Sequence, residues 1–269
     1  MNKEWQVPTY DVIEIEQKKC NYCLCIPVIN EGERILKQLD RVKPFLGQVD
    51  LLLLDGGSTD GSTELEKLRA KGVTTLLVKT GSGKLSAQLR MGYAYALEKG
   101  YKGIITVDGN GKDNVDAIPS FVQALEEGWD MVQGSRYIPG GQAINTPKIR
   151  HFAVKLIHVP VVSKVAGFKY TDTTNGYRGY STRYLLHNEV QPFRDIFNTY
   201  ELLAYLSVRA PQLGLRTKEI PVTRAYPPKG KTPTKISFFK GNSDLLKILW
   251  ELINHKYDPK NEVNDGTTY

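Results

Sequence analysis

The feature of this sequence that most constrains its fold is an alternation of short apolar runs with segments of helical periodicity. The apolar runs are rich in β-forming residues and stop at polar residues or glycine. They span residues 21–29, 50–54, 73–78, 103–107, 131–134 and 215–223. Apolar residues recur at helical spacing in residues 33–45, 87–99, 117–127, 148–168, 200–213 and 244–254. This order predicts an α/β fold with a mostly parallel, Rossmann-like sheet flanked by helices.

The length of 269 residues fits one large α/β domain or a domain with an appendage. No apolar run approaches the roughly 18 residues of a spanning helix, and the first 20 residues hold no signal-peptide core, so we expect a cytoplasmic protein. The cysteines Cys20, Cys23 and Cys25 stand too close together for a disulfide framework. We interpret them as strand cysteines, and a zinc half-site is the alternative.

Charge is distributed unevenly along the chain. Residues 1–134 hold 16 Lys and Arg against 19 Asp and Glu, a net charge of −3, whereas residues 135–269 hold 20 against 10, a net charge of +10. The basic half is expected to face an anionic partner, for which nucleic acid, an acidic membrane surface and a phosphorylated substrate are the candidates.

Acids, glycines and asparagines gather where the predicted strands end, in PVINEG (27–32), DGGSTD (55–60) and DGNGKD (108–113). In open parallel sheets ligands bind beyond these strand ends. Oxygens of Asp108 and Asn110 can hold a divalent cation that neutralises a diphosphate, while Asp55 and Asp60 can accept hydrogen bonds from a base or ribose. The alternative interpretation is that all of them only form turns.

Two common nucleotide motifs are absent. The segment KTGSGKLS (79–86) lacks the first glycine of a P-loop, and the turn after the first strand lacks the spaced glycines of a dinucleotide-binding fingerprint. A dinucleotide oxidoreductase is therefore disfavoured.

Taken in order, the motifs of residues 21–240 resemble those of the inverting family 2 glycosyltransferases, which have a GT-A fold, and especially of their polyprenyl- and dolichyl-phosphate mannose or glucose synthases. The segments that carry the resemblance are CIPVINEG (25–32), LLDGGSTDGST (53–63), SAQ and MG on the next helix, VDGN (107–110), QGSRY (133–137), DTTNGYRGYS (172–181), and EIPVTR (219–224) with the later TK (234–235). The resemblance implies a single GT-A domain that is a hexosyltransferase.

The resemblance assigns a role to each matching residue. Contacts with the nucleotide sugar are implied for Pro27, Asn30, Glu31, Asp55, Ser58, Asp60, Lys84, Arg136, Arg224 and Lys235. A Mg²⁺ or Mn²⁺ ion is implied at Asp108, Asn110 and Asp113. Catalytic roles are implied for Asp108, Arg178 and Glu201, with Glu201 as a base or only a helix cap.

This sequence departs from the family pattern at two positions. Gly56 stands where the family turn has a second Asp, and Asn110 replaces the second acid of the "D-x-D" motif. Metal affinity is weakened by the second change, or Asp113 supplies the missing charge.

The resemblance also implies a division of the chain. We expect an N-terminal extension (1–20), a nucleotide-sugar-binding part (21–134), a looser acceptor-side part (135–254) with a mobile loop (225–235), and a polar tail (255–269). The amphipathic segment 148–168 either lies in a membrane interface or packs on the core.

The predicted function is inverting transfer of a hexose from a UDP- or GDP-sugar to a polyprenyl phosphate or lipid-linked glycan, at the cytoplasmic membrane face and without nucleic acid. A phosphate acceptor needs no general base, whereas a sugar hydroxyl does. The alternatives are transfer to a hydroxyl of a surface polysaccharide, a nucleotidyltransferase, and a non-catalytic nucleotide-sugar-binding module.

Overall fold

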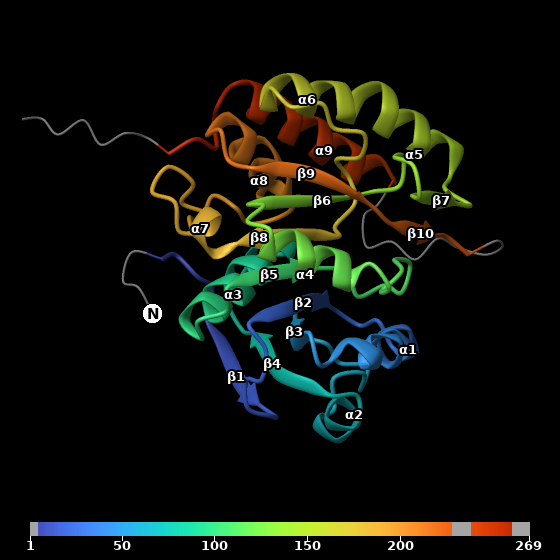
Figure 1. The fold of residues 1–269 in the computed structure, drawn as a ribbon, viewed down its shortest axis with the longest axis vertical. Coiled ribbons are helices and arrows are strands. Elements are labelled where there is room, and N and C mark those ends of the chain that lie inside the picture. Colours follow the sequence, from blue (N-terminus) through green and yellow to red (C-terminus); the bar gives the residue numbers. More distant parts are fainter. Residues whose placement is uncertain (1–4, 228–237, 260–269) are drawn as a thin grey trace, which may run out of the picture.

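An eight-stranded, mostly parallel sheet organises the part of the chain that is described, residues 5–227 and 238–259 of a computed structural model (Figure 1). Its strands lie in the order β1-β4-β3-β2-β5-β8-β6-β9. They are β1 (Tyr10–Glu14), β2 (Tyr22–Val28), β3 (Val49–Asp55), β4 (Val73–Lys79), β5 (Gly103–Thr106), β6 (Met131–Ser135), β8 (Arg178–Ser181) and β9 (Thr217–Pro221). The mostly parallel α/β sheet predicted from the sequence is confirmed.

Two antiparallel strands were not predicted. β1 pairs with the outer edge of β4 and so makes part of the expected N-terminal extension an integral strand. β8 lies between β5 and β6 and pairs antiparallel with both. The expected boundary at residue 134 therefore falls inside one continuous sheet.

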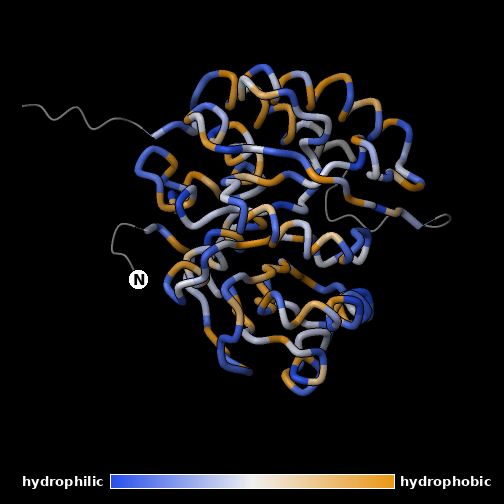
Figure 2. The backbone as a smooth tube through the Cα atoms, viewed as in Figure 1, coloured by the Kyte–Doolittle hydropathy of each residue, from blue (hydrophilic) through white to orange (hydrophobic). Residues whose placement is uncertain are grey.

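Helices cover both faces of the sheet. One face carries α1 (Glu33–Val42), which continues into the single turn η1 (Lys43–Phe45), and also α2 (Leu65–Ala70) and α4 (Ile118–Glu126). The other carries α3 (Leu85–Glu98), α6 (Val159–Ala166), α8 (Glu201–Gln212) and α9 (Phe238–Ile253), while α7 (Thr182–Leu185) follows β8. Because both faces are covered, β2 and β3 are buried along their whole length, and β3 carries a polar side chain only at Asp50 and Asp55. Figure 2 shows hydrophobic stretches both in the central strands and in the helices that cover them.

The predicted helix at 148–168 is three consecutive pieces. α5 (Lys148–Ala153) passes into a π-helical segment, η2 (Val154–His158), and then into α6. Pro160 stands in the first turn of α6, where it has no backbone N–H to continue the α-helical ladder. The wider π turn lies immediately before this proline.

A second, two-stranded sheet connects the two halves of the chain. β7 (Gln142–Ile144) pairs in parallel with β10 (Thr223–Ala225), and an isolated bridge joins Arg224 to Asp113. β10 therefore lies against the loop that follows β5. No helix among the described residues is long and apolar enough to cross a membrane.

Candidate active site

The loops after β2 and β3 are joined by hydrogen bonds at the carboxyl ends of these strands. Asn30, in a left-handed conformation, accepts a bond from the Thr59 N–H at 2.8 Å and donates its own N–H to Ser58 Oγ at 3.0 Å. The Gly32 N–H donates to Asp60 Oδ2 at 2.8 Å. The predicted polar loops thus form one rigid rim at the edge of the sheet.

The carboxylates of this rim are engaged in its turns. Asp55 Oδ1 accepts bonds from the Ser58 N–H at 2.9 Å and from Ser58 Oγ at 2.6 Å. Asp60 accepts a bond from Ser62 Oγ, which lowers the pKa of its carboxyl group. Glu31 accepts from Arg34 at 2.9 Å. Their contacts with a nucleobase or ribose stay predictions, as does that of Pro27, which is buried in β2.

A buried amide explains why Gly56 replaces the acid of the family turn. Gln88 on α3 donates to the Val28 and Leu54 carbonyls, at 2.9 and 3.0 Å, and so bridges the ends of β2 and β3. A Cβ atom at Gly56 would lie 2.9 Å from Gln88 Nε2. The glycine therefore leaves room for an interaction that supports the rim.

Arg224, on β10, bridges two carboxylates at the end of β5. Its Nη2 donates to Asp108 Oδ2 at 2.9 Å and its Nη1 donates to Asp113 Oδ2. Burial alone would raise the pKa of Asp108, but the charges of Arg224 and Lys112 outweigh burial and hold this pKa below its usual value. Asp108 is therefore a carboxylate held by a cation, and part of its side chain reaches solvent.

Asp113 does not fit the predicted role of metal ligand. Its side chain is buried, Arg224 takes one of its oxygens, and Oδ1 has no hydrogen-bond partner. Burial raises its pKa. Arg224 bonds both Asp108 and Asp113, in the space that an ion shared between these two carboxylates would need. The metal-ligand role of Asp113 stays a prediction, and this geometry does not favour it.

Asp108 and Asn110 remain the predicted ligands of a divalent ion. The Asn110 amide nitrogen donates to Asp108 Oδ2 at 3.3 Å, and its oxygen accepts from the Lys112 N–H at 3.3 Å. The described residues contain no group of three His, Cys, Asp or Glu side chains placed to hold a metal. Asp108 Oδ1 lies against Gly176, where a Cβ would come within 2.5 Å of it. A carboxylate and an amide oxygen suit Mg²⁺ or Mn²⁺ when substrate phosphates complete the coordination shell, and an ion here would need the Asn110 amide to turn its oxygen toward Asp108.

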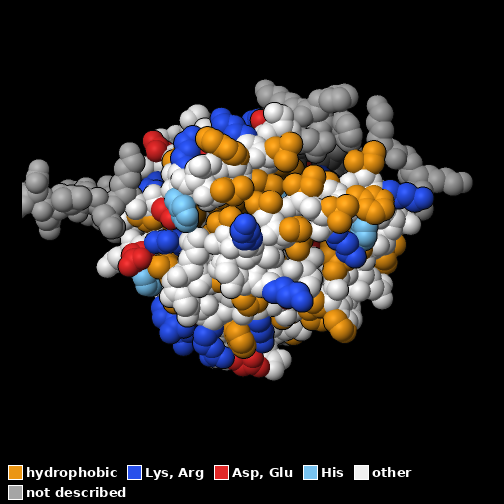
Figure 3. Space-filling view, turned by 90° about the horizontal axis from the view of Figure 1, so that it is seen from above, with side chains coloured by type: hydrophobic (Ala, Val, Ile, Leu, Met, Phe, Trp, Pro, Cys, Tyr) orange, Lys and Arg blue, Asp and Glu red, His pale blue; other side chains and the backbone are white. Residues whose placement is uncertain are grey.

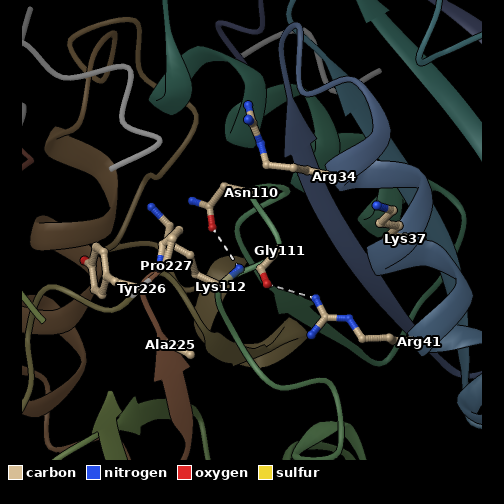
Figure 4. A pocket seen from close by; sticks show the side chains of 9 residues that line it. All are labelled: Arg34, Lys37, Arg41, Asn110, Gly111, Lys112, Ala225, Tyr226 and Pro227. Atoms are coloured by element: carbon tan, nitrogen blue, oxygen red, sulfur yellow. Dashed lines mark hydrogen bonds between the residues drawn. The ribbon is translucent and has the colours of Figure 1, made fainter. Parts of the chain in front are cut away.

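A basic pocket of about 530 Å³ opens beside Asn110 (Figure 4). α1 supplies Arg34, Lys37 and Arg41 from one side, and Lys112 and Tyr226 line the other. Arg41 donates to the Gly111 carbonyl at 3.0 Å and so fixes the loop that carries Asn110. Four cationic side chains around one pocket favour an anionic ligand. None of the four was predicted from the sequence, although the spacing of the three cations on α1, at positions i, i+3 and i+7, indicates one helical face.

A chain of cations around Tyr226 runs from Asp108 toward α5. The Arg224 guanidinium lies 5.9 Å from the centre of the Tyr226 ring, and the Tyr226 hydroxyl accepts a bond from Arg150 of α5 at 3.0 Å. The charges of Arg224 and Arg150 outweigh burial and lower the pKa of Tyr226. Lys112 lies over the same ring at 5.1 Å. This arrangement stabilises negative charge between Asp108 and α5.

Arg136 and Asp172 form a neighbouring ion pair that is buried. Arg136 donates to the two Asp172 oxygens, from Nε at 2.6 Å and from Nη2 at 2.8 Å. Side-chain exposure is 2% for Arg136 and 0% for Asp172. Arg136 therefore joins two motifs of the chain, and direct contact with a phosphate is not supported.

Arg178 is likewise a buried structural residue. Its guanidinium donates to the Asn175 and Thr173 carbonyls, each at 3.0 Å, and to Ser207 Oγ of α8 at 2.9 Å. These bonds hold the loop containing Gly176 between Asp108 and α8. The catalytic role predicted for Arg178 stays a prediction, and its guanidinium is engaged by these internal partners.

The last predicted residues lie at the junction of α3 and α8. Glu201 accepts bonds from the Asn198 and Thr199 N–H groups at 3.1 and 2.7 Å, and from Thr199 Oγ1, so its carboxylate forms the turn before α8. Lys84 is exposed at the start of α3, and its N–H donates to the Asn198 carbonyl at 2.8 Å. Lys235 and most of loop 225–235 and tail 255–269 lie outside the described residues.

Comparisons with known proteins identify related sequences and a related fold. The model of "Glycosyl transferase family 2" matches residues 23–188. The chain is 28% identical over 200 residues to the undecaprenyl-phosphate mannosyltransferase of Micrococcus luteus, covering 74% of this chain and 81% of that protein. It is 27% identical over 201 residues to the polyprenol monophosphomannose synthase of Mycolicibacterium smegmatis, covering 74% and 75%.

A solved structure shares the fold at low identity. It is glucosyl-3-phosphoglycerate synthase from Mycobacterium tuberculosis in complex with Mn²⁺, UDP and glucosyl-3-phosphoglycerate, with a TM-score of 0.62, 16% identity, and coverage of 89% of this chain and 81% of that one. The fold is thus the GT-A fold. Because the family model spans more than half of the chain, including both loops of the rim and the segment around Asp108, the chain belongs to glycosyl transferase family 2.

Proposed function

We propose that this protein transfers a hexose from a nucleoside diphosphate sugar to a polyprenyl phosphate, with inversion at the anomeric carbon. The observation that carries the proposal is the chain of Arg224, Lys112, Tyr226 and Arg150 between Asp108 and α5. Such a path of cationic side chains suits an acceptor that is itself a phosphate. The related enzymes of Micrococcus luteus and Mycolicibacterium smegmatis are named for the same class of acceptor.

In the proposed reaction, a phosphate oxygen of the acceptor attacks the anomeric carbon while the bond from that carbon to the donor diphosphate breaks. The nucleoside diphosphate leaves with the electron pair, and no proton has to be removed from the acceptor. The carboxylate of Glu201 is taken up by the turn before α8, which agrees with a reaction that needs no general base.

The donor diphosphate is proposed to lie in the basic pocket beside Asn110, next to Arg34, Lys37 and Lys112. A Mg²⁺ or Mn²⁺ ion held by Asp108 and Asn110 would neutralise charge on the leaving group. Arg224 orients Asp108 through its bond of 2.9 Å, and it adds a fixed positive charge where negative charge develops. The proposed donor is a UDP- or GDP-hexose.

A radiolabelled transfer assay tests this proposal. The intact protein is incubated with UDP- or GDP-hexose, Mg²⁺ or Mn²⁺ and undecaprenyl phosphate in detergent, and label that moves into organic solvent is counted. We expect one donor to give labelled lipid. Asp108→Asn should lower the rate by roughly 10²-fold or more, the size typical of a lost charge-stabilising group. Asp116→Asn, at an exposed position of the same loop, is the matched control and should keep the rate.

Other outcomes would favour the alternatives. Labelled oligosaccharide instead of labelled lipid would indicate a hydroxyl acceptor, and pyrophosphate release from a nucleoside triphosphate would indicate nucleotidyl transfer. A thermal shift with nucleotide sugar but no turnover with any acceptor would indicate a binding module.

A further inference from the structure

A buried amide stands on α1 at a position where packing alone would favour an apolar side chain. Gln38 is 1% exposed, and it shares its helical face with Ile35, Leu39 and Val42, which are buried in the core. Burying a side-chain amide costs free energy unless its polar groups form hydrogen bonds. The partners of Gln38 therefore show what this residue contributes.

Both polar groups of this amide bond the loop that follows β5. Gln38 Nε2 donates to the Asp108 carbonyl at 2.9 Å, and Gln38 Oε1 accepts from the Gly111 N–H at 2.8 Å. Arg41, three residues further along α1, adds a bond to the Gly111 carbonyl, which Figure 4 shows. α1 thus holds the main chain of this loop on both sides of Asn110.

Main-chain bonding to the strands is interrupted within this loop. Val107 donates its N–H to β2, and among the described residues the next main-chain bond to a strand is the one that the Lys112 carbonyl accepts from Ala225 of β10. Between them, Gly109 packs against β2, where a Cβ atom would lie 2.8 Å from the Pro27 carbonyl oxygen. β2 therefore backs the loop on one side, and α1 supplies hydrogen bonds on the other.

We propose that Gln38 is a positioning residue, which fixes the main chain of this loop so that Asp108 and Asn110 can bind an ion and a phosphate together. Gln38 lies outside the lining of the basic pocket and acts only through the loop. In a fixed loop the Asn110 amide can bring its oxygen to Asp108 by rotating its side chain alone, and ordering the site then costs less of the binding free energy. The inference rests on the proposed function in one respect, because that proposal places the ion and the donor diphosphate beside this loop.

The variant Gln38→Met removes the bonds and keeps the packing. Methionine is unbranched, like glutamine, and has no amide group, so it fills the same space without bonding the loop. In hydrogen exchange of the ligand-free full chain, followed by NMR, protection of the Gly111 N–H should fall roughly tenfold. Calorimetry then uses whichever of UDP and GDP the wild type binds more tightly. Its dissociation constant with Mn²⁺ should rise roughly tenfold or more, whereas the value without Mn²⁺ should stay within about twofold.

Two control variants lose comparable bonds away from this loop. Gln212→Met repeats the substitution on α8, where Gln212 donates to the Val165 carbonyl of α6 at 3.0 Å. α6 lies apart from α1 in Figure 1, at the end of the molecule that Figure 3 shows. Tyr101→Phe removes a buried bond of 2.9 Å to Asp50, just before β5 and at the end of that strand remote from the loop. Tyr101→Phe should lower the urea midpoint as Gln38→Met does, and both controls should keep the exchange protection and the Mn²⁺-dependent affinity of the wild type.

The positioning role of Gln38 is wrong if Gln38→Met keeps the protection of Gly111, if it keeps the Mn²⁺-dependent affinity, or if Tyr101→Phe weakens that affinity as much. It is also wrong if the wild type binds neither nucleotide more tightly with Mn²⁺ than without it. Failure of the proposed function would look different. The wild type would then bind nucleotide with Mn²⁺ and Gln38→Met would weaken that binding, but no hexose would move to undecaprenyl phosphate.

Discussion

Replacing Arg136 by methionine should destabilise the protein strongly, because it leaves Asp172 buried without its counter-charge. The two side chains are 2% and 0% exposed and share two charge-assisted bonds of 2.6 and 2.8 Å. After the substitution Asp172 keeps the bonds from the N–H groups of Arg136 and Thr174 and a long one from Thr174 Oγ1, at 3.5 Å, but no counter-charge. Removing one partner of such a buried pair costs about 3–5 kcal/mol of unfolding free energy.

A double-mutant cycle separates this cost from the loss of packing. Asp172→Leu alone strands Arg136, which cannot lose its proton, and should cost a similar amount. The double variant Arg136→Met with Asp172→Leu leaves no buried charge, so its loss should be at least about 2 kcal/mol smaller than the sum of the single losses. Urea unfolding followed by tryptophan fluorescence gives the four free energies.

A functional measurement on the same variants completes the test. If Arg136 instead touches a phosphate of the donor, Arg136→Met should raise the dissociation constant of the nucleotide sugar while the urea midpoint stays at the wild-type value. That pair of results, or full additivity in the cycle, would refute a structural role for Arg136. Removing the exposed pair Lys71–Asp40 serves as the control and should leave the midpoint unchanged.

Four further predictions follow from single side chains. Burial lowers the pKa of His158 to about 4, so between pH 6.5 and 4 the unfolded chain binds a proton that the folded chain does not. The free energy of unfolding should therefore fall by up to about 3 kcal/mol over this range, and His158→Asn should flatten the slope in urea titrations at several pH values. Gly56→Asp should cost about 1–3 kcal/mol by displacing Gln88, and much less in a Gln88→Ala background, as double-mutant unfolding would show. Arg178→Met should lower the melting temperature with little change in donor affinity measured well below melting, and weak donor binding at full stability would contradict its structural role. Glu201→Gln should keep transfer to lipid phosphate within about threefold, whereas loss of a general base would cost roughly 10²–10⁴-fold in the same assay.

The parallel part of the fold was predictable because its signals are local. Strands buried on both faces form continuous apolar runs such as residues 50–54, and the helices between them repeat every three to four residues. The two antiparallel strands lack such signals. β8 has four residues and contains Arg178 and Gly179, and it gains its place only from pairing with β5 and β6.

The sequence predicted which residues lie near the site, but not which groups their side chains contact. The sequence placed Asp108, Asn110 and Arg224 in motifs, and the fold brings Asp108, Asn110 and Arg224 together. The sequence contains no measure of burial, so Arg136 was interpreted as a contact of the nucleotide sugar and Arg178 as a catalytic residue, although both are bonded to internal partners. An arginine inside a motif can either contact the substrate or pair with buried groups of the protein, and only its surroundings distinguish these two roles.

The position of β8 also affects how the chain is made. The inner edge of β5 pairs with β8, so it has no antiparallel neighbour until Arg178–Ser181 has left the ribosome. At ordinary rates of translation this takes on the order of ten seconds after β5 is synthesised. During that interval the nascent chain carries an apolar strand with open backbone hydrogen-bonding groups, the form most prone to pairing with other chains. Cellular yield of this protein should therefore depend on factors that shield nascent chains, and slowing translation between β5 and β8 should lower the soluble fraction.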